Sequence, residues 1–154
     1  MLIAAILLAA TGEPTLAEQG VAAFKSTCLD SRQAGPNGVR AALAVLGAKR
    51  QPDLPSLTNG RPMEMWVTDE LEFLLRPDRR GYGCFVAFKQ IAASDLDGAV
   101  SALSALPELV SKTVKPSKRI SYQWTFSDGS KDSVHLTPDS QLGGVLINLE
   151  VERK

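Results

Sequence analysis

The single histidine of the chain, His135, is the only side chain of the usual kind that could act as a general base near neutral pH. On a strand it shares one face with Ser133 and Thr137. A histidine beside a hydroxyl can activate a nucleophile, so a small hydrolase is one interpretation. The chain has no G-x-S-x-G motif, however, and a flat sheet face offers no evident oxyanion hole. We therefore favour a solvated strand histidine and a domain without enzymatic activity.

The two cysteines, Cys28 and Cys84, could form a disulfide, or Cys84 could be a reactive thiol beside His135. Cys28 shares a predicted helical stripe with Phe24, and Cys84 shares a predicted strand face with Val86. Both cysteines should therefore face the core, and an even pair in an exported protein most often forms a disulfide. We predict a Cys28–Cys84 bridge, which in the chain-entropy model contributes about 4 kcal/mol through its constraint on the unfolded chain.

Clustered arginines and one tryptophan are the other candidates for a binding surface. The arginines could bind an anionic envelope component or a partner carboxylate, or simply form a solvated hairpin tip. Trp66 could mark a binding surface if it is exposed, whereas core packing is the alternative. The candidate binding residues are thus Arg76, Arg79, Arg80, His135 and Trp66.

Composition argues against metal, cofactor and nucleic-acid binding. One histidine and two cysteines cannot build a Cys/His zinc site by themselves. Asp95 and Asp97 fit the start of a helix better than a cation site, and Gly81-Tyr82-Gly83 lacks the features of a phosphate-binding loop. The charge balance, 17 basic against 17 acidic residues, is not that of a nucleic-acid binder. We expect no metal and no cofactor, and as partner a protein or an envelope component.

The N-terminus has the layout of a secretory signal peptide. Residues 2–10 are an unbroken apolar run, about half the ~20 residues that a membrane-spanning helix needs. Small residues follow, and we place cleavage after Ala17, with cleavage after Gly12 as the alternative. No Lys or Arg precedes the run, so a buried N-terminal helix or strand is the competing interpretation. We predict a signal peptide over 1–17, a single domain over 18–154, no stable membrane insertion, and a periplasmic or secreted location.

Hydrophobic periodicity predicts an α+β domain. Two helices come first, a third lies in the middle, and the other periodic segments alternate as strands. Prolines and an Asn-Gly pair predict a long loop over 49–62. The expected fold is an antiparallel sheet of about five strands, with two N-terminal helices and one central helix on one face, and without an internal repeat. The helices are expected over 17–30, 36–46 and about 95–106.

The last hairpin has a predictable register. A two-residue turn at Asp128-Gly129 would place Trp124 opposite a polar residue. A loop of three or five residues instead pairs Trp124 with Val134, and Tyr122 with Leu136. Since a slip by one residue moves every side chain to the other face, the apolar match and the longer loop are preferred.

The pattern Phe24-x3-Cys28, followed by Gly83-Cys84-x-Val86 and a closing hairpin around Trp124, resembles small exported bacterial proteins with a cysteine pair. The resemblance extends over most of the chain after the apolar run. It implies a disulfide-bonded scaffold and brings no catalytic residues with it.

Overall fold

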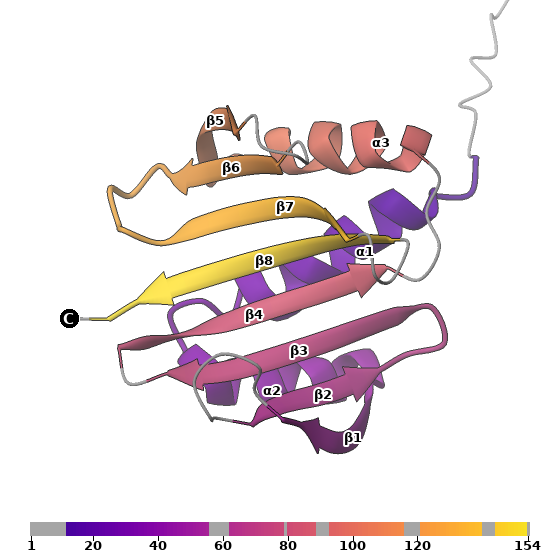
Figure 1. Cartoon of the computed structure of the whole chain (residues 1–154), viewed down its shortest axis with the longest axis vertical. Helices are drawn as coiled ribbons and strands as arrows, with labels where there is room; N and C mark the ends of the chain where they lie inside the picture. The colour runs from indigo at the N-terminus through magenta and orange to yellow at the C-terminus, as the bar shows by residue number, and fades with distance from the viewer. Residues whose placement is uncertain are drawn as a thin grey trace, which may run out of the picture.

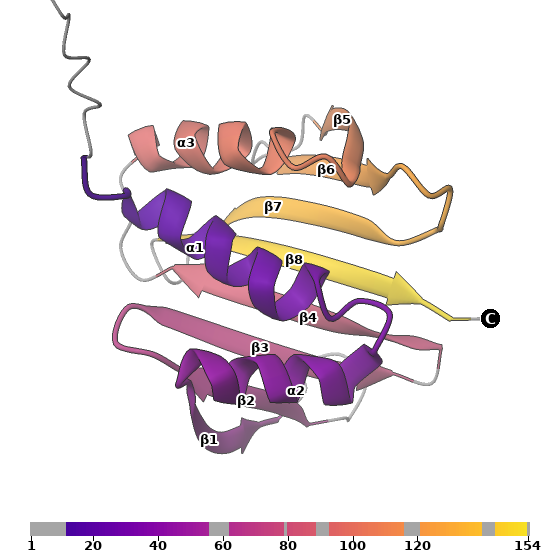
Figure 2. The same ribbon diagram turned by 180° about the vertical axis from the view of Figure 1, so that it is seen from behind.

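The computed structural model describes residues 12–55, 62–78, 80–88, 93–115, 121–139 and 144–153. Within these ranges the chain forms one antiparallel sheet of eight strands with helices on one face (Figures 1 and 2). The helices are α1 (Leu16–Phe24), which continues into the π-helix η1 (Lys25–Leu29), α2 (Gly35–Leu46) and α3 (Ala93–Ser104). The strands are β1 (Lys49–Leu54), β2 (Met63–Val67), β3 (Leu71–Asp78), β4 (Gly81–Phe88), β5 (Leu109–Lys115), β6 (Ser121–Phe126), β7 (Ser133–Asp139) and β8 (Gly144–Glu152).

The predicted α+β class and the antiparallel sheet are confirmed, but the expected number of about five strands is wrong. The segments missed at the two sheet edges are β1, inside the expected loop 49–62, and β5, which hydrophobic periodicity does not predict as a strand. Each edge strand has a register shift, between Gln51 and Leu54 in β1 and between Val110 and Thr113 in β5. Exposed edge strands interrupted by bulges lack the two-residue apolar alternation that identifies a strand from sequence.

Local sequence accounts for both N-terminal helices. Thr15 caps α1 in a capping box, in which Glu18 in turn accepts a hydrogen bond from the Thr15 backbone N–H at 2.8 Å. Pro36 lies in the first turn of α2, where a missing backbone N–H does no harm. Gly47 ends α2 with a φ of 81°, a conformation that favours glycine.

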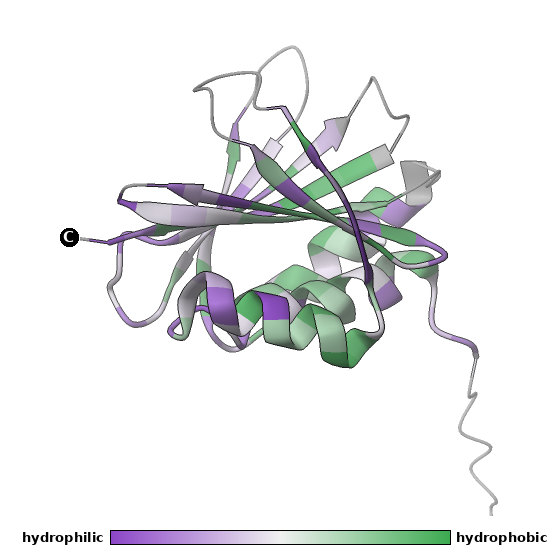
Figure 3. Ribbon diagram, turned by 90° about the horizontal axis from the view of Figure 1, so that it is seen from below, coloured by the Kyte–Doolittle hydropathy of each residue, from purple (hydrophilic) through white to green (hydrophobic). Residues whose placement is uncertain are grey.

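The core lies between the sheet and the helices, as the side view in Figure 3 shows. The predicted hairpin register is confirmed, since Trp124 pairs with Val134 and Tyr122 with Leu136. The paired residues stop at Thr125 and Ser133, so the loop is longer than the three or five residues expected. The largest fully buried side chains are Trp124, Phe24, Phe73, Phe88, Leu43, Leu75, Leu103, Leu136, Ile147, Leu149, Val39 and Val86.

The sheet consists of two equivalent halves. Its strand order is β1-β2-β3-β4-β8-β7-β6-β5, so each half runs inward from its edge in chain order, and the halves join through the antiparallel β4–β8 pair. A helix precedes each set of four strands, α2 before β1–β4 and α3 before β5–β8. This is the arrangement of two α-β-β-β-β units related by an approximate two-fold axis between β4 and β8.

Residue identities at matching positions support an internal repeat, contrary to our expectation of none. Superimposing the two strand registers aligns the Leu-x-Pro-Asp segment that begins at Leu75 with the one that begins at Leu136. The same correspondence aligns two buried helix residues, Leu43 and Leu103. The repeat is not evident from the sequence because the loops of the two halves differ in length and few residues are identical. The identical pairs are Gly38 and Gly98, Ala42 and Ala102, Leu43 and Leu103, Leu46 and Leu106, Trp66 and Trp124, Leu75 and Leu136, Pro77 and Pro138, Asp78 and Asp139, and Gly81 and Gly144.

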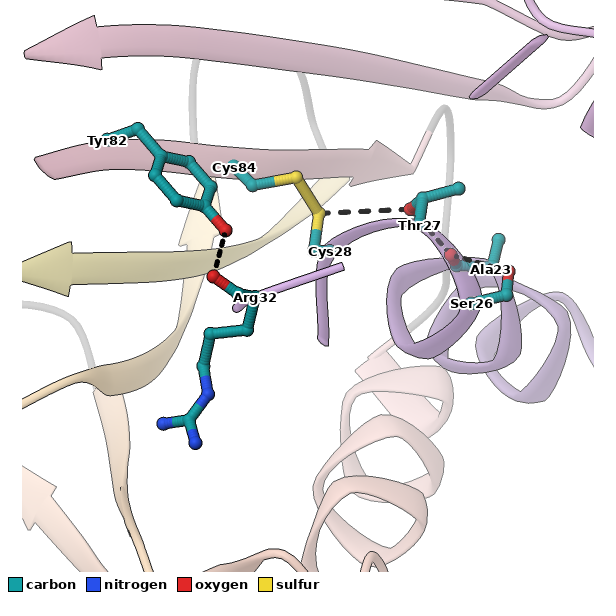
Figure 4. Close-up of a disulfide and its surroundings, with 7 residues drawn as sticks. All are labelled: Ala23, Ser26, Thr27, Cys28, Arg32, Tyr82 and Cys84. Carbon is teal, nitrogen blue, oxygen red and sulfur yellow. Dashed lines mark hydrogen bonds between the residues drawn. A yellow bond between two sulfur atoms is a disulfide. The ribbon is translucent and has the colours of Figure 1, made fainter. Parts of the chain in front are cut away.

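The Cys28–Cys84 disulfide joins the helical layer to the centre of the sheet (Figure 4). Cys28 lies in η1 and Cys84 in β4, with Cα atoms 5.8 Å apart. Their exposed fractions are 0% and 1%, so the bridge is enclosed by the core. The predicted bridge is present, and Cys84 is therefore no free thiol beside His135.

Candidate functional site

The face of the sheet opposite the helices is the surface on which two of the predicted binding residues meet. Alternation along the strands places Arg76 of β3 and His135 of β7 on this open face. Because β4 and β8 lie between β3 and β7, the open-face residues between Arg76 and His135 belong to these two strands.

A row of paired residues crosses the open face and changes from apolar to polar at its centre. On the first half it consists of Met65, Leu74 and Phe85, and on the second half it continues with Asn148, His135 and Gln123. Phe85 and Asn148 pair directly with each other, so the approximate two-fold axis passes between them.

The repeat shows how far the two halves differ on this face. At five positions an apolar residue of the first half corresponds to a polar residue of the second, whereas the helix-covered side is mostly apolar in both, with Glu64 of β2 as a charged exception. Two position pairs reverse the trend, Gly83 and Leu146 near the centre and Lys49 and Val110 at the sheet edges. Both residues are polar at Arg76 and Thr137 and at Glu72 and Ser133. The apolar-to-polar pairs are Met65 and Gln123, Val67 and Thr125, Leu74 and His135, Phe85 and Asn148, and Ala87 and Glu150.

Glu150 holds the polar side chains at the centre of the open face together. Its carboxylate accepts hydrogen bonds from Arg76 Nη2 at 2.9 and 3.0 Å and from Asn148 Nδ2 at 2.8 Å. The Arg76 guanidinium also lies 5.3 Å from the centre of the Phe85 ring, within reach of a cation–π contact. We call Arg76, Ser133, His135, Asn148 and Glu150 the open-face cluster.

Two polar atoms of the open-face cluster, Arg76 Nε and Asn148 Oδ1, are buried and have no hydrogen-bond partner among the described residues. One is a donor and the other an acceptor. A buried polar atom without a partner costs about 1–3 kcal/mol. The Asn148 orientation is consistent with its neighbour, because its Nδ2 donates to the Glu150 carboxylate.

His135 contacts Ser133 on its own strand and pairs with Asn148 on β8. Ser133 Oγ lies 2.8 Å from His135 Nε2. Burial lowers the pKa of His135, as does the positive charge of Lys115, while Glu150 acts in the opposite direction. The imidazole is therefore held more firmly in its neutral form than in an unfolded chain.

A depression of about 300 Å³ adjoins the open-face cluster at the end of β4 and β8. Ser133 and Glu150 of the cluster line it, together with Arg80 and Lys131. Arg80 is exposed in the turn between β3 and β4 and lines the depression together with Glu150, the partner of Arg76. Arg76 itself lies within β3 and is partly buried, not at a solvated hairpin tip.

The remaining predicted binding residues do not join the cluster. Trp66 pairs with Phe73, which places it on the helix-covered side, where it packs against the core. Its neighbour there is Arg50, whose guanidinium lies 5.5 Å from the centre of the Trp66 ring. Arg79 lies outside the described residues, as do residues 1–11 of the predicted signal peptide.

Asn148 and Glu150 are the cluster residues that sequence reasoning missed. The apolar alternation of Val145, Ile147 and Leu149 predicts that Asn148 and Glu150 face away from the core. That signal does not reveal which strands flank β8, and hence which side chains Asn148 and Glu150 meet.

Within the described ranges, no group of three or more His, Cys, Asp or Glu residues is arranged to hold a metal ion. No helix in the same ranges is both long and apolar enough to cross a lipid bilayer. Comparison of the chain with protein-family models, with curated proteins and with solved structures gave no match.

Proposed function

We propose that this protein is an exported, non-enzymatic binding domain that holds a protein or an envelope component on the open face of its sheet. The observation that carries this proposal is the divergence of the repeat: equivalent positions are mostly apolar towards the helices, whereas at five positions of the open face an apolar residue of the first half corresponds to a polar residue of the second. Solvation alone would favour polar residues on both halves. A ligand with apolar and polar parts accounts for the division.

The open-face cluster supports the same proposal. Arg76, Asn148 and Glu150 place charged and amide groups beside the aromatic ring of Phe85. Binding sites typically combine an apolar surface with a few polar groups that orient the ligand. Export is supported by the disulfide, because such bonds persist in oxidising compartments, and by the signal-like sequence before Ala17.

Site-specific photocrosslinking in the native host tests the proposal. A benzoylphenylalanine residue replaces Leu74 on the open face or, as control, the exposed Ala41 on α2. We expect an adduct of defined mass from position 74 and none from position 41. Failure to form an adduct at position 74, or identical adducts from both positions, would contradict a binding role for the open face.

The Ser133–His135 contact favours a second candidate function, a small hydrolase in which His135 activates Ser133. Against it, the strands on both sides of Ser133 pair with β7, which leaves few backbone N–H groups for an oxyanion hole. Hydrolysis of p-nitrophenyl acetate by the wild type and by His135→Ala and Ser133→Ala distinguishes the two functions. A binding domain gives equal background rates in all three proteins, whereas a hydrolase loses its activity in both variants.

A further inference from the structure

The two halves of the repeat differ in what contacts the turn between their second and third strands. In the second half this turn connects β6 to β7, and Arg32 from the η1–α2 connection docks against it. Arg32 Nη1 donates to Ser130 Oγ and Asp132 Oδ2, both at 3.0 Å, and Arg32 Nη2 donates to Asp128. The guanidinium also stacks on the ring of Phe126, 3.8 Å from its centre.

In the first half the equivalent turn connects β2 to β3 and carries two exposed acidic residues, Asp69 and Glu70. Neither side chain has a hydrogen-bond or ion-pair partner in the part of the chain that the structure describes. Among the described residues, no arginine pairs with Asp69 or Glu70 as Arg32 pairs with Asp128 and Asp132, and α1 packs extensively against α3. Figure 2 shows α1 crossing the sheet obliquely, close to α3 at its start.

A groove occupies the position beside this turn. It consists of two adjoining depressions of about 400 and 440 Å³, which share Leu46, Thr68 and Asp69. Gln19 and Ala23 of α1 form its other wall. We call this surface the α1–α2 groove.

The rim of the α1–α2 groove is both apolar and electronegative. Leu46 is 40% exposed, and the neighbouring Val45 is 90% exposed, the largest value among the exposed large hydrophobic residues. The C-terminus of α2 points its carbonyl dipoles here, and no basic residue lies in the last turn of the helix. Lys49 on the far side offsets only part of the negative charge of Asp69 and Glu70.

We propose that the α1–α2 groove binds a segment of a partner protein that presents an arginine next to an apolar side chain. The arginine would interact with Asp69 and Glu70 as Arg32 does with Asp128 and Asp132 in the other half, and the apolar side chain would cover Leu46 and Val45. This surface lies on the helical side of the molecule, so it is separate from the open face and does not depend on its function.

Chemical-shift titration of the ¹⁵N-labelled full chain tests the proposal, with the peptide acetyl-Leu-Arg-Leu-amide as probe. A matched peptide carries citrulline, which keeps the shape of arginine without its charge. We expect saturable shifts of the Gln19, Ala23 and Leu46 amides and of residues 68–71, with a Kd of about 1 mM. Citrulline, or the double substitution Asp69→Asn and Glu70→Gln, should weaken binding about fivefold.

Asp97→Asn, which removes an exposed acid of α3, is the control and should leave the titration unchanged. The proposal is overturned if the arginine peptide causes no saturable shifts at the groove. It is equally overturned if the citrulline peptide binds as well as the arginine peptide, or if the Asp69 and Glu70 substitutions have no more effect than Asp97→Asn.

Discussion

Phe85 of β4 and Asn148 of β8 lie directly opposite each other at the centre of the sheet. The two residues also occupy equivalent positions of the repeat, Phe85 in the first half and Asn148 in the second. An aromatic ring thus corresponds to an amide, side by side on one surface. On the other side of the same strands, Val86 pairs with Ile147, and both are fully buried. The two halves share a core pattern and differ on the open face.

The disulfide should contribute a large part of the stability. Cys28 and Cys84 are 56 residues apart, so replacing both with alanine should lower the free energy of unfolding by about 4 kcal/mol. Urea denaturation of the oxidised wild type and of the double variant measures the difference. Reductant should destabilise the wild type alone, and equal stability of the two oxidised proteins would contradict the prediction.

His135 should make the folded protein less stable in mild acid. Burial lowers its pKa below the ordinary value of 6.5, so the unfolded chain takes up a proton first as the pH falls. The contribution is fully present above pH 6.5 and is lost as the pH falls through the pKa of the folded state. Unfolding free energies between pH 7.5 and pH 5 should decrease more steeply in the wild type than in His135→Gln, and parallel curves would contradict this.

Substitution of Arg32 should destabilise the protein more than most substitutions outside the core. Its side chain is 11% exposed and pairs with Asp132, whose side chain is 5% exposed. Arg32→Met should destabilise the protein by about 3 kcal/mol, because it leaves a buried carboxylate without its cation. Arg32→Lys keeps the positive charge but not the planar guanidinium, and it is the matched control. Its free energy of unfolding should fall by less in the same denaturation experiment. A near-neutral Arg32→Met would show that the network contributes little.

The N-terminus of the mature protein should lie at or before Thr15. Thr15 caps α1, and Ala17 is completely buried against the core. Cleavage after Ala17 would remove the cap, which is worth about 1 kcal/mol, together with a packed residue. We therefore expect cleavage after Gly12 rather than after Ala17, and the intact mass of protein from the native host measures it. A mature chain beginning at Glu18 would contradict this preference.

Sequence reasoning works best where burial imposes a strict period. The register of Trp124 against Val134 follows from apolar alternation alone, and so does the inward direction of both cysteines. The edge strands β1 and β5 lack this apolar alternation, because an exposed edge strand does not need an apolar face.

The open-face cluster was predictable only in part. Alternation places His135 and Ser133 on the outer face of their strand, but the contact between Arg76 and Glu150 depends on the pairing of β4 with β8. These strands are separated by the whole second half of the repeat, and local patterns contain no information about such a pairing. Recognising the Leu-x-Pro-Asp repeat would have suggested two similar halves, although not the edge through which they join.

The central claim is that the open face of the sheet binds a partner, and the most direct measurement is the affinity of the crosslinked partner for three purified proteins. These are the wild type, Leu74→Lys, which puts a charge into the apolar half of the open face, and Ala41→Lys, which puts the same charge on exposed α2. We predict that Leu74→Lys weakens binding at least about tenfold, or 1.4 kcal/mol, while Ala41→Lys binds like the wild type. Equal affinity of Leu74→Lys and the wild type would contradict the claim.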